Sequence, residues 1–282
     1  MPVPPLAEQR RIVVKLDSLF ARTRSAREEL ARIPRLIEHY KQAVLTSLFD
    51  VGGACDSVTI DSLTEFVTSG SRGWARYYAE KGDLFLRVGN TKRGDAGLDL
   101  TEVQRVQPPK GAEGRRTRVR ANDIIVTITA DLGRVSVIPS DFETAYVNQH
   151  VALMRLNDPD LAPFIAWYLI SPGGQAKLLE RNRGMTKAGL SLDDIRSVNV
   201  PLPAERLREQ IVAKIRDLNA WVQTVQSESA AASHLMDHLD QANLAKGFRG
   251  ELVPQDPNEE PASALLERIR AARAAEPKRR RR

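Results

Sequence analysis

The side chains best suited to chemistry in this sequence are arginines, lysines and amides, and the cations are unevenly spread. One stretch of six cations holds a single acidic residue, Glu113: Arg105, Lys110, Arg115, Arg116, Arg118 and Arg120. A second group consists of Lys177, Arg181, Arg183 and Lys187. Clustered cations neutralise phosphate groups, and the fork of an arginine can also bind the edge of a guanine. Both groups therefore predict contact with a nucleic acid.

Three amides are candidates for reading bases, because Asn and Gln can bind adenine through two hydrogen bonds. They are Asn90, Asn148 and Gln149. Residues 69–78 combine arginines with aromatic residues, and residues 184–189 form a glycine-bounded loop that permits close approach to a sugar-phosphate backbone. The predicted DNA-contacting residues are Ser71, Arg72, Trp74, Arg76, Tyr77, Asn90, Lys92, Arg93, Arg115, Arg116, Arg118, Asn148, Gln149, Arg183, Thr186 and Lys187. For any one arginine a solvated surface position is the alternative, and Trp74 fits a buried core position as well as an exposed wedge.

Motifs for catalysis are absent from the sequence. It contains no Asn/Asp-Pro-Pro-aromatic motif of an amino methyltransferase, no Gly-Lys-Ser/Thr phosphate loop and no Gly-x-Gly-x-x-Gly fingerprint. His234 and His238 have the spacing of a metal pair but lack a third ligand, and the single cysteine, Cys55, cannot form an internal disulfide. We therefore expect a non-enzymatic chain with no catalytic residues, no metal and no cofactor of its own.

Composition is typical of a globular protein, and its overall charge says little about partners. The formal net charge is +6, of which the residues from Lys278 to Arg282 supply five, so the remainder is nearly neutral. This basic tail is expected to be solvated, with a nonspecific phosphate contact as the alternative. No apolar run reaches the roughly 20 residues of a membrane helix, and the first residues lack a signal peptide's apolar stretch. We expect a cytoplasmic protein without a membrane partner.

An internal repeat frames the chain and dictates which elements position these residues. Residues 12–49 match residues 211–248 at a constant offset of 199 without a gap. Identical pairs include Ile12 with Ile211, Leu19 with Leu218, His39 with His238, Gln42 with Gln241 and Phe49 with Phe248. Each copy follows a proline-bearing lead-in, residues 3–8 and 200–205, which predicts an extended segment and then a helix start.

Apolar positions in the first copy recur in alternating steps of four and three residues, which is typical of a coiled-coil seam. The seam runs through Ile12, Leu16, Leu19, Thr23, Ala26, Leu30, Ile33, Ile37, Tyr40 and Val44. The offset carries it to Ile211, Ile215, Leu218, Val222, Val225, Ser229, Ala232, Met236, Leu239 and Asn243. We predict two long helices that pair along unlike but fitting seams, with a kink or short break at Pro34.

Residues 51–200 differ from the helices, with short β-rich runs between turns marked by Gly and Pro. Strands are predicted at residues 84–88, 123–129, 135–139 and 151–156, and helices at residues 162–170 and 174–181. This mixture predicts one α+β domain of ordinary size.

The order of these elements resembles the specificity subunit of Type I restriction-modification systems. Residues 5–13 and 41–45 look like that family's central conserved region, and residues 184–190, 200–203 and 246–252 resemble the end of a target-recognition domain and the distal conserved region. The resemblance implies an α+β fold class, with one mixed α/β target-recognition domain flanked by two long helices that form an antiparallel coiled coil. The predicted bounds are 1–50 for the first helix, 51–203 for the recognition domain, 204–250 for the second helix, and 251–282 for a short helix and the basic tail.

The resemblance also implies a non-catalytic subunit that reads DNA for partner enzymes. In the family, two recognition domains lie at opposite ends of the helical spacer, and each reads half of a bipartite site. Expected partners are double-stranded DNA, methyltransferase subunits that flip and methylate adenine at N6, and a translocating restriction subunit. S-adenosylmethionine is expected in the methyltransferase. This chain has one recognition domain, so a second must come from another copy of the chain or from a separate chain, or be missing.

Other interpretations of the sequence stay open beside this resemblance. An assembly or decoy component would bind methyltransferase subunits through its helices without reading DNA. A coiled-coil protein without any role at DNA is a third class. The sequence also fits a monomer or a dimer, and a dimer would read a palindromic site because a twofold assembly reads inverted half-sites.

Overall fold

The computed structural model describes residues 3–50, 55–180 and 189–275. Its packing divides the chain into two compact units. Unit 1 comprises Met1–Ile37 and Trp221–Arg282, and unit 2 comprises Glu38–Ala220. Both long helical stretches contribute to both units. The units therefore meet within the helices, after Ile37 and after Ala220, whereas the predicted domain bounds lie at 50 and 203.

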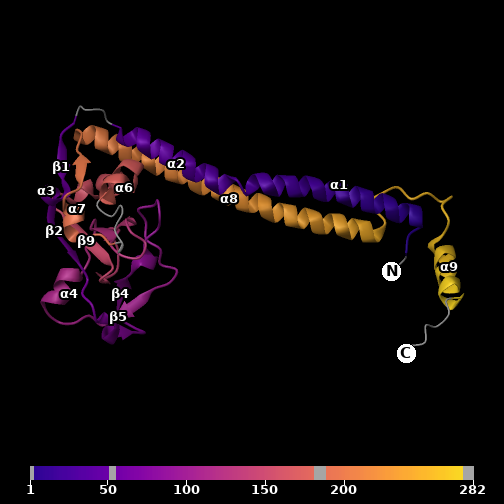
Figure 1. Ribbon diagram of the computed structural model, residues 1–282, viewed down its shortest axis with the longest axis horizontal. Helices are drawn as coiled ribbons and strands as arrows, with labels where there is room; N and C mark the ends of the chain where they lie inside the picture. The colour runs from indigo at the N-terminus through magenta and orange to yellow at the C-terminus, as the bar shows by residue number, and fades with distance from the viewer. Residues whose placement is uncertain (1–2, 51–54, 181–188, 276–282) are drawn as a thin grey trace. The chain divides into compact units, whose positions relative to one another are not determined.

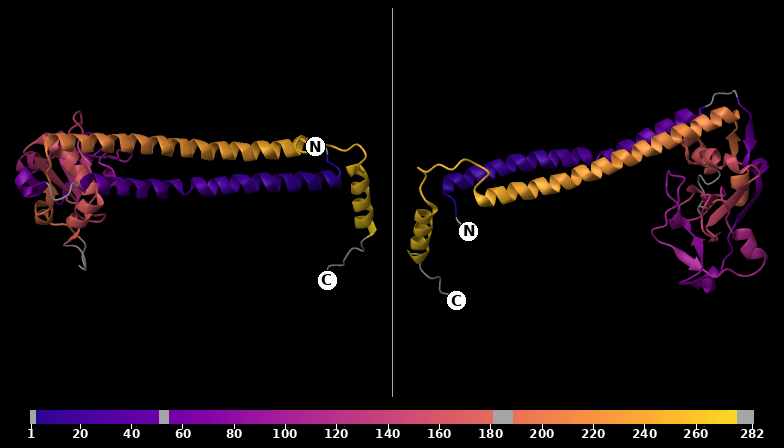
Figure 2. Two further views of the ribbon diagram at one scale, coloured as in Figure 1. Left: turned by 90° about the horizontal axis from the view of Figure 1, so that it is seen from above. Right: turned by 180° about the vertical axis from the view of Figure 1, so that it is seen from behind.

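In unit 1, helix α1 (Leu6–Leu30) runs antiparallel to the C-terminal part of helix α8 (Glu205–Arg249), as all the views show (Figure 1 and Figure 2). Thr23 Oγ1 donates to Asp240 Oδ1 at 2.9 Å, and Arg27 Nη2 lies 2.8 Å from Asp240 Oδ2. Later in α8, Gly247 packs against Ile12 and Leu16 near the start of α1. Rising residue numbers in one helix thus meet falling numbers in the other, which confirms the predicted antiparallel pair. A shorter helix, α9 (Ala262–Ala275), follows in the same unit.

The two copies of the repeat begin with the same local contact. Gln9 Nε2 donates to the carbonyl oxygen of Pro4 at 2.8 Å, and Arg208 Nη1 donates to that of Pro203 at 2.7 Å. Both pairs join equivalent positions of the repeat. In each copy a side chain in the first helical turns therefore fixes the proline-bearing lead-in, so the sequence repeat is also a structural one.

The first copy breaks where Pro34 predicts. Helix α1 ends at Leu30 and α2 (Ile33–Phe49) follows, with Pro34 in its first turn, where the missing N–H costs no hydrogen bond. Beyond the break Lys41 is buried and Tyr40 is 52% exposed. The predicted seam is therefore wrong at Tyr40, because Lys41 faces inward instead, with its Nζ 5.3 Å from the centroid of the Trp167 ring.

The second copy departs from the predicted seam at the equivalent position. Leu239 is 51% exposed, and Asp240 turns inward instead, beside Thr23 and Arg27. Here an ion pair and a hydrogen bond between the helices, not apolar contact, decide which residue faces the partner. The remaining predicted seam positions in both copies are buried or half-buried.

The described residues of unit 2 form two four-stranded sheets and a two-stranded one. The first sheet is antiparallel, in the order β2 (Thr64–Ser69), β9 (Val151–Leu156), β6 (Ile124–Thr127) and β7 (Val135–Val137). The second has the order β3 (Tyr78–Ala79), β5 (Gln104–Val106), β4 (Asp83–Leu86) and β8 (Ala145–Val147), with β4 and β8 parallel. The third joins β1 (Ser57–Thr59) to β10 (Asn199–Pro201). The predicted strands thus correspond to β4, β6, β7 and β9.

Helix α5 (Ala162–Ile170) occupies the centre of the core of unit 2, and all its residues except Pro163 are buried. A helix that is apolar all round has to be covered on every side. On one side it meets α2 and α8: the ring of Phe49 lies 5.5 Å from that of Phe164 and 5.6 Å from that of Tyr168, and Ile211 and Ile215 join the same cluster. The long helices and the sheet domain of unit 2 therefore share one core.

Short helices complete unit 2: α3 (Ile60–Leu63), α4 (Ala112–Thr117), α6 (Pro172–Leu178) and α7 (Leu192–Arg196), with 3₁₀ turns at Trp74–Tyr77, Val88–Asn90 and Pro159–Leu161. The mixed content, with long helices before and after a sheet domain, confirms the predicted α+β class. Within the described ranges, none of the helices combines the length and the apolar character that crossing a membrane requires.

Candidate nucleic-acid interface

Three loops leave the same edge of the four-stranded antiparallel sheet. Ser69 at the end of β2 pairs with Ala152, Val151 at the start of β9 pairs with Thr127, and Val126 pairs with Val135 at the start of β7. The connections at residues 70–73, 128–134 and 148–150 therefore emerge side by side. We call these three segments the loop edge.

Loop 70–73 is held by a very close backbone approach and by one arginine. Gly70 N donates to the carbonyl oxygen of Asn148 at 3.2 Å, and a Cβ atom at Gly70 would lie 2.3 Å from the carbonyl oxygen of Val147. Arg116, on α4, donates to the carbonyl oxygen of Ser69 and to Ser71 Oγ, both at 2.9 Å, and also contacts Thr68 Oγ1. Arg72 follows in this fixed loop with an exposed side chain.

The turn at residues 148–150 is ordered by its own side chains. Asn148 Oδ1 accepts a hydrogen bond from His150 N at 3.0 Å, and Gln149 Nε2 lies 2.9 Å from His150 Nε2. The other ring nitrogen of His150 contacts Thr129 Oγ1 in the neighbouring loop, and the His150 carbonyl oxygen accepts from Ile128 N at 2.9 Å. Backbone and side-chain bonds thus join this turn to loop 128–134.

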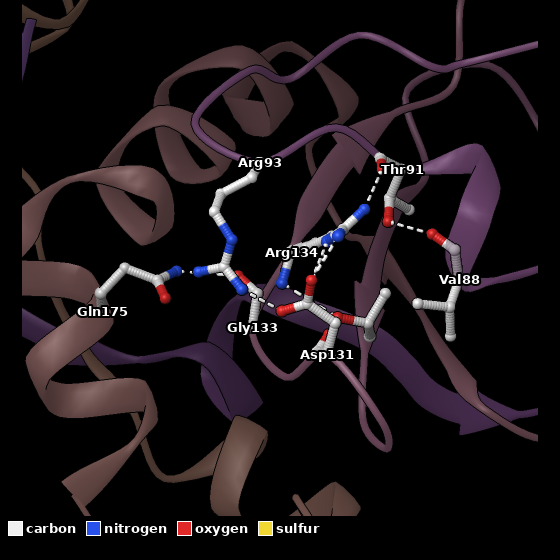
Figure 3. A network of polar contacts seen from close by, with 8 residues as sticks. Val88, Thr91, Arg93, Asp131, Gly133, Arg134 and Gln175 are labelled. Atoms are coloured by element: carbon white, nitrogen blue, oxygen red, sulfur yellow. Dashed lines mark hydrogen bonds and ion pairs between the residues drawn. The ribbon is translucent and has the colours of Figure 1, made fainter. Parts of the chain in front are cut away.

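Loop 128–134 is restrained by the network that Figure 3 shows. Asp131 lies between two guanidinium groups, those of Arg93 and Arg134, and Arg134 Nη1 also donates to the Thr91 carbonyl oxygen at 2.9 Å. Gln175 Nε2 donates to the carbonyl oxygen of Gly133 at 2.8 Å. Within the loop Ala130 has a φ of 64°, a left-handed conformation that is uncommon outside glycine.

The comparisons with known proteins agree with this geometry. A family model described as the Type I restriction modification DNA specificity domain matches residues 113–229, which include two of the three segments of the loop edge. This part of the chain resembles a Type I DNA specificity domain. Over 98% of its length it is similar to the Type I restriction enzyme EcoBI specificity subunit of Escherichia coli, with 30% identical residues, and it spans 65% of that subunit.

Two solved structures have a similar fold. The HsdS subunit from Thermoanaerobacter tengcongensis matches with a TM-score of 0.59 and 25% identity, over 89% of this chain and 61% of that one. A chain from a study of complex assembly and conformational transition in the type I R-M system has a TM-score of 0.69 with 24% identity, over 89% of this chain and 61% of the other. This chain therefore spans less than two thirds of the length of these relatives.

In unit 2, several of the predicted DNA contacts gather at the loop edge. Arg93, Arg116, Asn148 and Gln149 belong to it or bind it, as do Ser71 and Arg72. Lys92, beside Arg93, is exposed. Arg183, Thr186 and Lys187 lie outside the described residues. After that gap Leu190 N donates to the carbonyl oxygen of Ile128 at 2.9 Å, so the described chain resumes at the loop edge.

The rest of the predicted cationic stretch lies elsewhere in unit 2. Arg115, Arg118 and Arg120 line a separate depression of about 560 Å³, and Arg120 lies towards the start of β6, away from the end of that strand at the loop edge. Arg105 pairs with Glu143 at 2.9 Å, and this hydrogen bond raises the pKa of the guanidinium above its ordinary value. Of the predicted cationic stretch 105–120, Arg116 therefore binds the loop edge, whereas Arg105, Arg115, Arg118 and Arg120 lie away from it.

Two predicted contacts are corrected by their burial. Trp74 is 2% exposed, stacks on Phe85 at 5.2 Å between ring centroids and donates through Nε1 to Glu113 Oε1, so of its two alternatives the structure gives the buried one. Asn90 is 3% exposed and donates from Nδ2 to the carbonyl oxygens of Asp99 and Glu102, both at 2.9 Å. Its amide is already used inside the domain and is not an available base reader.

The aromatic cluster around Trp74 also holds two further predicted DNA contacts, Tyr77 and Arg76. Tyr77 packs edge-on against Trp74 at 5.9 Å, and the guanidinium of Arg76 lies over the Tyr77 ring at 4.8 Å. Tyr146 joins the cluster, and burial, together with the nearby Asp83, raises the pKa of its hydroxyl. Arg76 is exposed above this cluster, and the aromatic rings beneath it fill a core.

Sequence reasoning missed Thr129 and His150, which connect two segments of the loop edge. A single histidine and a threonine inside a β-rich run carry no spacing signal. Their significance comes from strand pairing that brings residue 129 beside residue 150. The adjacency of His150 to two amides, Asn148 and Gln149, is the one local sign that could have drawn attention to it.

Proposed function

We propose that this chain is a sequence-specific DNA-recognition subunit of a Type I restriction-modification complex. It directs adenine N6 methylation by a partner methyltransferase, which binds S-adenosylmethionine, and restriction by a partner translocating nuclease. It performs neither reaction itself. The observation that carries this proposal is the match of residues 113–229 to a Type I DNA specificity domain, together with a loop edge that combines Gln149, inside the match, with the exposed Arg72 and Arg93.

The chemistry of the loop edge supports both parts of recognition. Exposed guanidinium groups contact phosphates and set the register of the protein on a duplex, whereas amides and hydroxyls read base edges. Here both kinds of group emerge from loops that are tied to a sheet through Gly70, Arg116 and Asp131. Rigid loops lose little conformational entropy on binding, which favours specificity over nonspecific attachment.

A second recognition domain is part of the proposal, because unit 1 has an apolar groove between the start of α1 and the end of α8. The repeat equates these helix ends with the start of α8 and the end of α2, on which the sheet domain of unit 2 packs. The groove, with a volume of about 850 Å³, is lined by Val3, Ile12, Val13, Leu16, Leu244 and Phe248 among others. The repeat pairs Leu244 with Leu45, Phe248 with Phe49, and Ile12 with Ile211. Leu45, Phe49 and Ile211 pack against α5 in unit 2. In the groove of unit 1, by contrast, Phe248 is 65% exposed and Val13 is 55% exposed.

The groove therefore fits a helix of the same chemistry as α5, apolar all round and carrying aromatic rings. We assign it to the second recognition domain of the proposed assembly. The relatives are longer than this chain, which leaves room in them for such a domain. A second copy of this chain on the groove would appear as a dimer in light scattering and would contradict this assignment.

Selection from a random-sequence DNA library tests the proposed function. The full chain is incubated with duplexes at moderate salt, and the retained duplexes are sequenced. The proposal predicts enrichment of one short motif, with affinity that falls steeply as salt rises. Binding without an enriched motif, or a chain that captures a methyltransferase subunit but no DNA, would favour the assembly or decoy interpretation instead.

A further inference from the structure

The side chain of Gln149 is held at the loop edge by two neighbours that have no other assigned role. Its Nε2 lies 2.9 Å from His150 Nε2, and His150 Nδ1 contacts Thr129 Oγ1. The backbone of His150 is fixed as well, since its N donates to Asn148 Oδ1 at 3.0 Å and its carbonyl oxygen accepts from Ile128 N. A row of three polar side chains thus spans two segments of the loop edge.

The donors and acceptors in this row follow from its chemistry. An amide nitrogen donates only, so His150 Nε2 is the acceptor, and a neutral imidazole then carries its proton on Nδ1 and donates to Thr129 Oγ1. Gln149 keeps one N–H and its Oε1, and neither has a further partner among the residues that the structure describes. A donor and an acceptor side by side on one amide match N6 and N7 of adenine in the major groove.

The surroundings hold this row in one place. Loop 128–134 is restrained by Arg93, Arg134 and Gln175 (Figure 3). Ala130, next to Thr129, keeps a φ of 64°, a conformation that a non-glycine residue adopts only where its surroundings enforce it. Such strain is typical of sites where a side chain must be presented in a fixed orientation.

We propose that Gln149 reads an adenine in the recognised DNA sequence, and that His150 and Thr129 are positioning residues that orient its amide. This inference rests on the proposed function and names one of its base-reading residues. The other predicted amides fit this role less well. Asn90 is buried with its amide engaged, and Asn148 is 6% exposed with its Oδ1 used by His150 N.

The test repeats the duplex selection with variants of the full chain. Gln149→Ala should lose the preference for adenine at one position and keep the rest of the motif, with about tenfold weaker binding of the wild-type motif. Gln149→Glu retains acceptor oxygens but loses the amide donor, so it should lose the same preference for adenine. This variant replaces Gln149→Ala in the test if the alanine variant folds poorly. Gln107→Ala, a matched change at an exposed glutamine following β5, should select the wild-type motif.

The positioning role has its own signature. His150→Ala and Thr129→Val should weaken selectivity at the position that Gln149 controls and at no other. Adding His150→Ala to Gln149→Ala should cause no further loss, because the row acts through one amide.

An unchanged motif from Gln149→Ala overturns the inference while the proposed function stands. Additive losses, or losses at different positions, overturn the positioning role. A wild-type chain that selects no motif overturns the proposed function and this inference together.

Discussion

The arginines of the loop edge differ in what their guanidinium groups already contact. Arg116 donates to Ser69 and Ser71, and Arg134 binds Asp131 and Thr91, so both are occupied in holding loops. Arg72 is exposed and has no polar partner among the described residues. We therefore expect Arg72 to contact phosphate, and Arg116 and Arg134 to act by positioning.

Replacing Arg72 with alanine should weaken binding to all duplexes alike, since a phosphate contact carries no sequence information. The slope of log affinity against log salt should fall by about 1, the contribution of one released counterion. Fluorescence anisotropy at several salt concentrations measures both effects. Arg24→Ala, an exposed arginine on α1 in unit 1, is the matched control and should leave the slope unchanged. A change in the selected motif with no change in slope would contradict a phosphate role for Arg72.

A buried ion pair in unit 2 makes a separate prediction about stability. Asp123 is 2% exposed, and its carboxylate accepts from Arg155 Nε at 2.9 Å and from Arg155 Nη2 at 2.6 Å. Asp123→Asn leaves the arginine charge uncompensated in the core, which should lower the free energy of unfolding by about 3 kcal/mol. Urea denaturation measures this change. Asp193→Asn, which breaks an exposed pair with Arg196, should cost less than about 1 kcal/mol, and equal losses would contradict the argument.

The candidate site could be predicted in part, because residue type and local order carry some of its chemistry. Arg72, Arg116 and Gln149 were identified by type, and the structure brings them to one edge of a sheet. Trp74 and Asn90 were chosen on the same grounds of residue type and local order, but packing against residues distant in sequence buries them. The sequence has no signal for that burial, nor for the contact between Thr129 and His150, since both depend on strand pairing.

At the scale of elements, the closest approach in the loop edge depends on Gly70. A Cβ atom there would meet the backbone of Val147 at 2.3 Å, so Gly70→Ala should push β2 away from the turn at 148–150. We expect a loss of about 2 kcal/mol in the free energy of unfolding and a less selective DNA motif. Gly173→Ala, where a Cβ has open space, should change stability by less than about 0.5 kcal/mol. Thermal and urea unfolding of both variants give the comparison, and similar stabilities would contradict the role of Gly70.

The elements with long or repeated patterns were predicted best. Helix α5 and strand β9 have the predicted bounds, because apolar runs flanked by turn residues define them locally. The pairing of β1 with β10 joins segments more than a hundred residues apart, and no local pattern indicates it. The seam failed at Tyr40 and Leu239 for a related reason, since contacts with residues distant in the sequence, Trp167 for Lys41 and Arg27 for Asp240, decide which side chain faces inward.

At the scale of the whole molecule, the repeat offers a matched pair of substitutions. Phe49 packs on Phe164 and Tyr168, whereas its counterpart Phe248 is 65% exposed in the groove of unit 1. Phe49→Ala should lower the free energy of unfolding by about 3 kcal/mol, and Phe248→Ala should change it by less than about 0.5 kcal/mol. Urea denaturation of the two variants tests this asymmetry.

A fusion tests what the groove accepts. Residues 51–201 placed directly before residue 3 would supply a second recognition domain at the equivalent position of the repeat, because residue 3 corresponds to residue 202. In that fusion Phe248→Ala should become as destabilising as Phe49→Ala, because α5 of the added domain would cover the ring. If Phe248→Ala stays neutral in a fusion whose two domains are both folded, the groove does not accept a recognition domain.

The measurement that tests the central claim most directly is a genome-wide map of N6-methyladenine. The chain is expressed with a Type I methyltransferase subunit in cells that lack this modification. We predict methylation at one defined sequence motif, and loss of its specificity at one position in the Gln149→Ala variant. Methylation at random adenines, or none, while a full-length specificity subunit directs methylation in the same cells, would contradict a role for this chain in reading DNA.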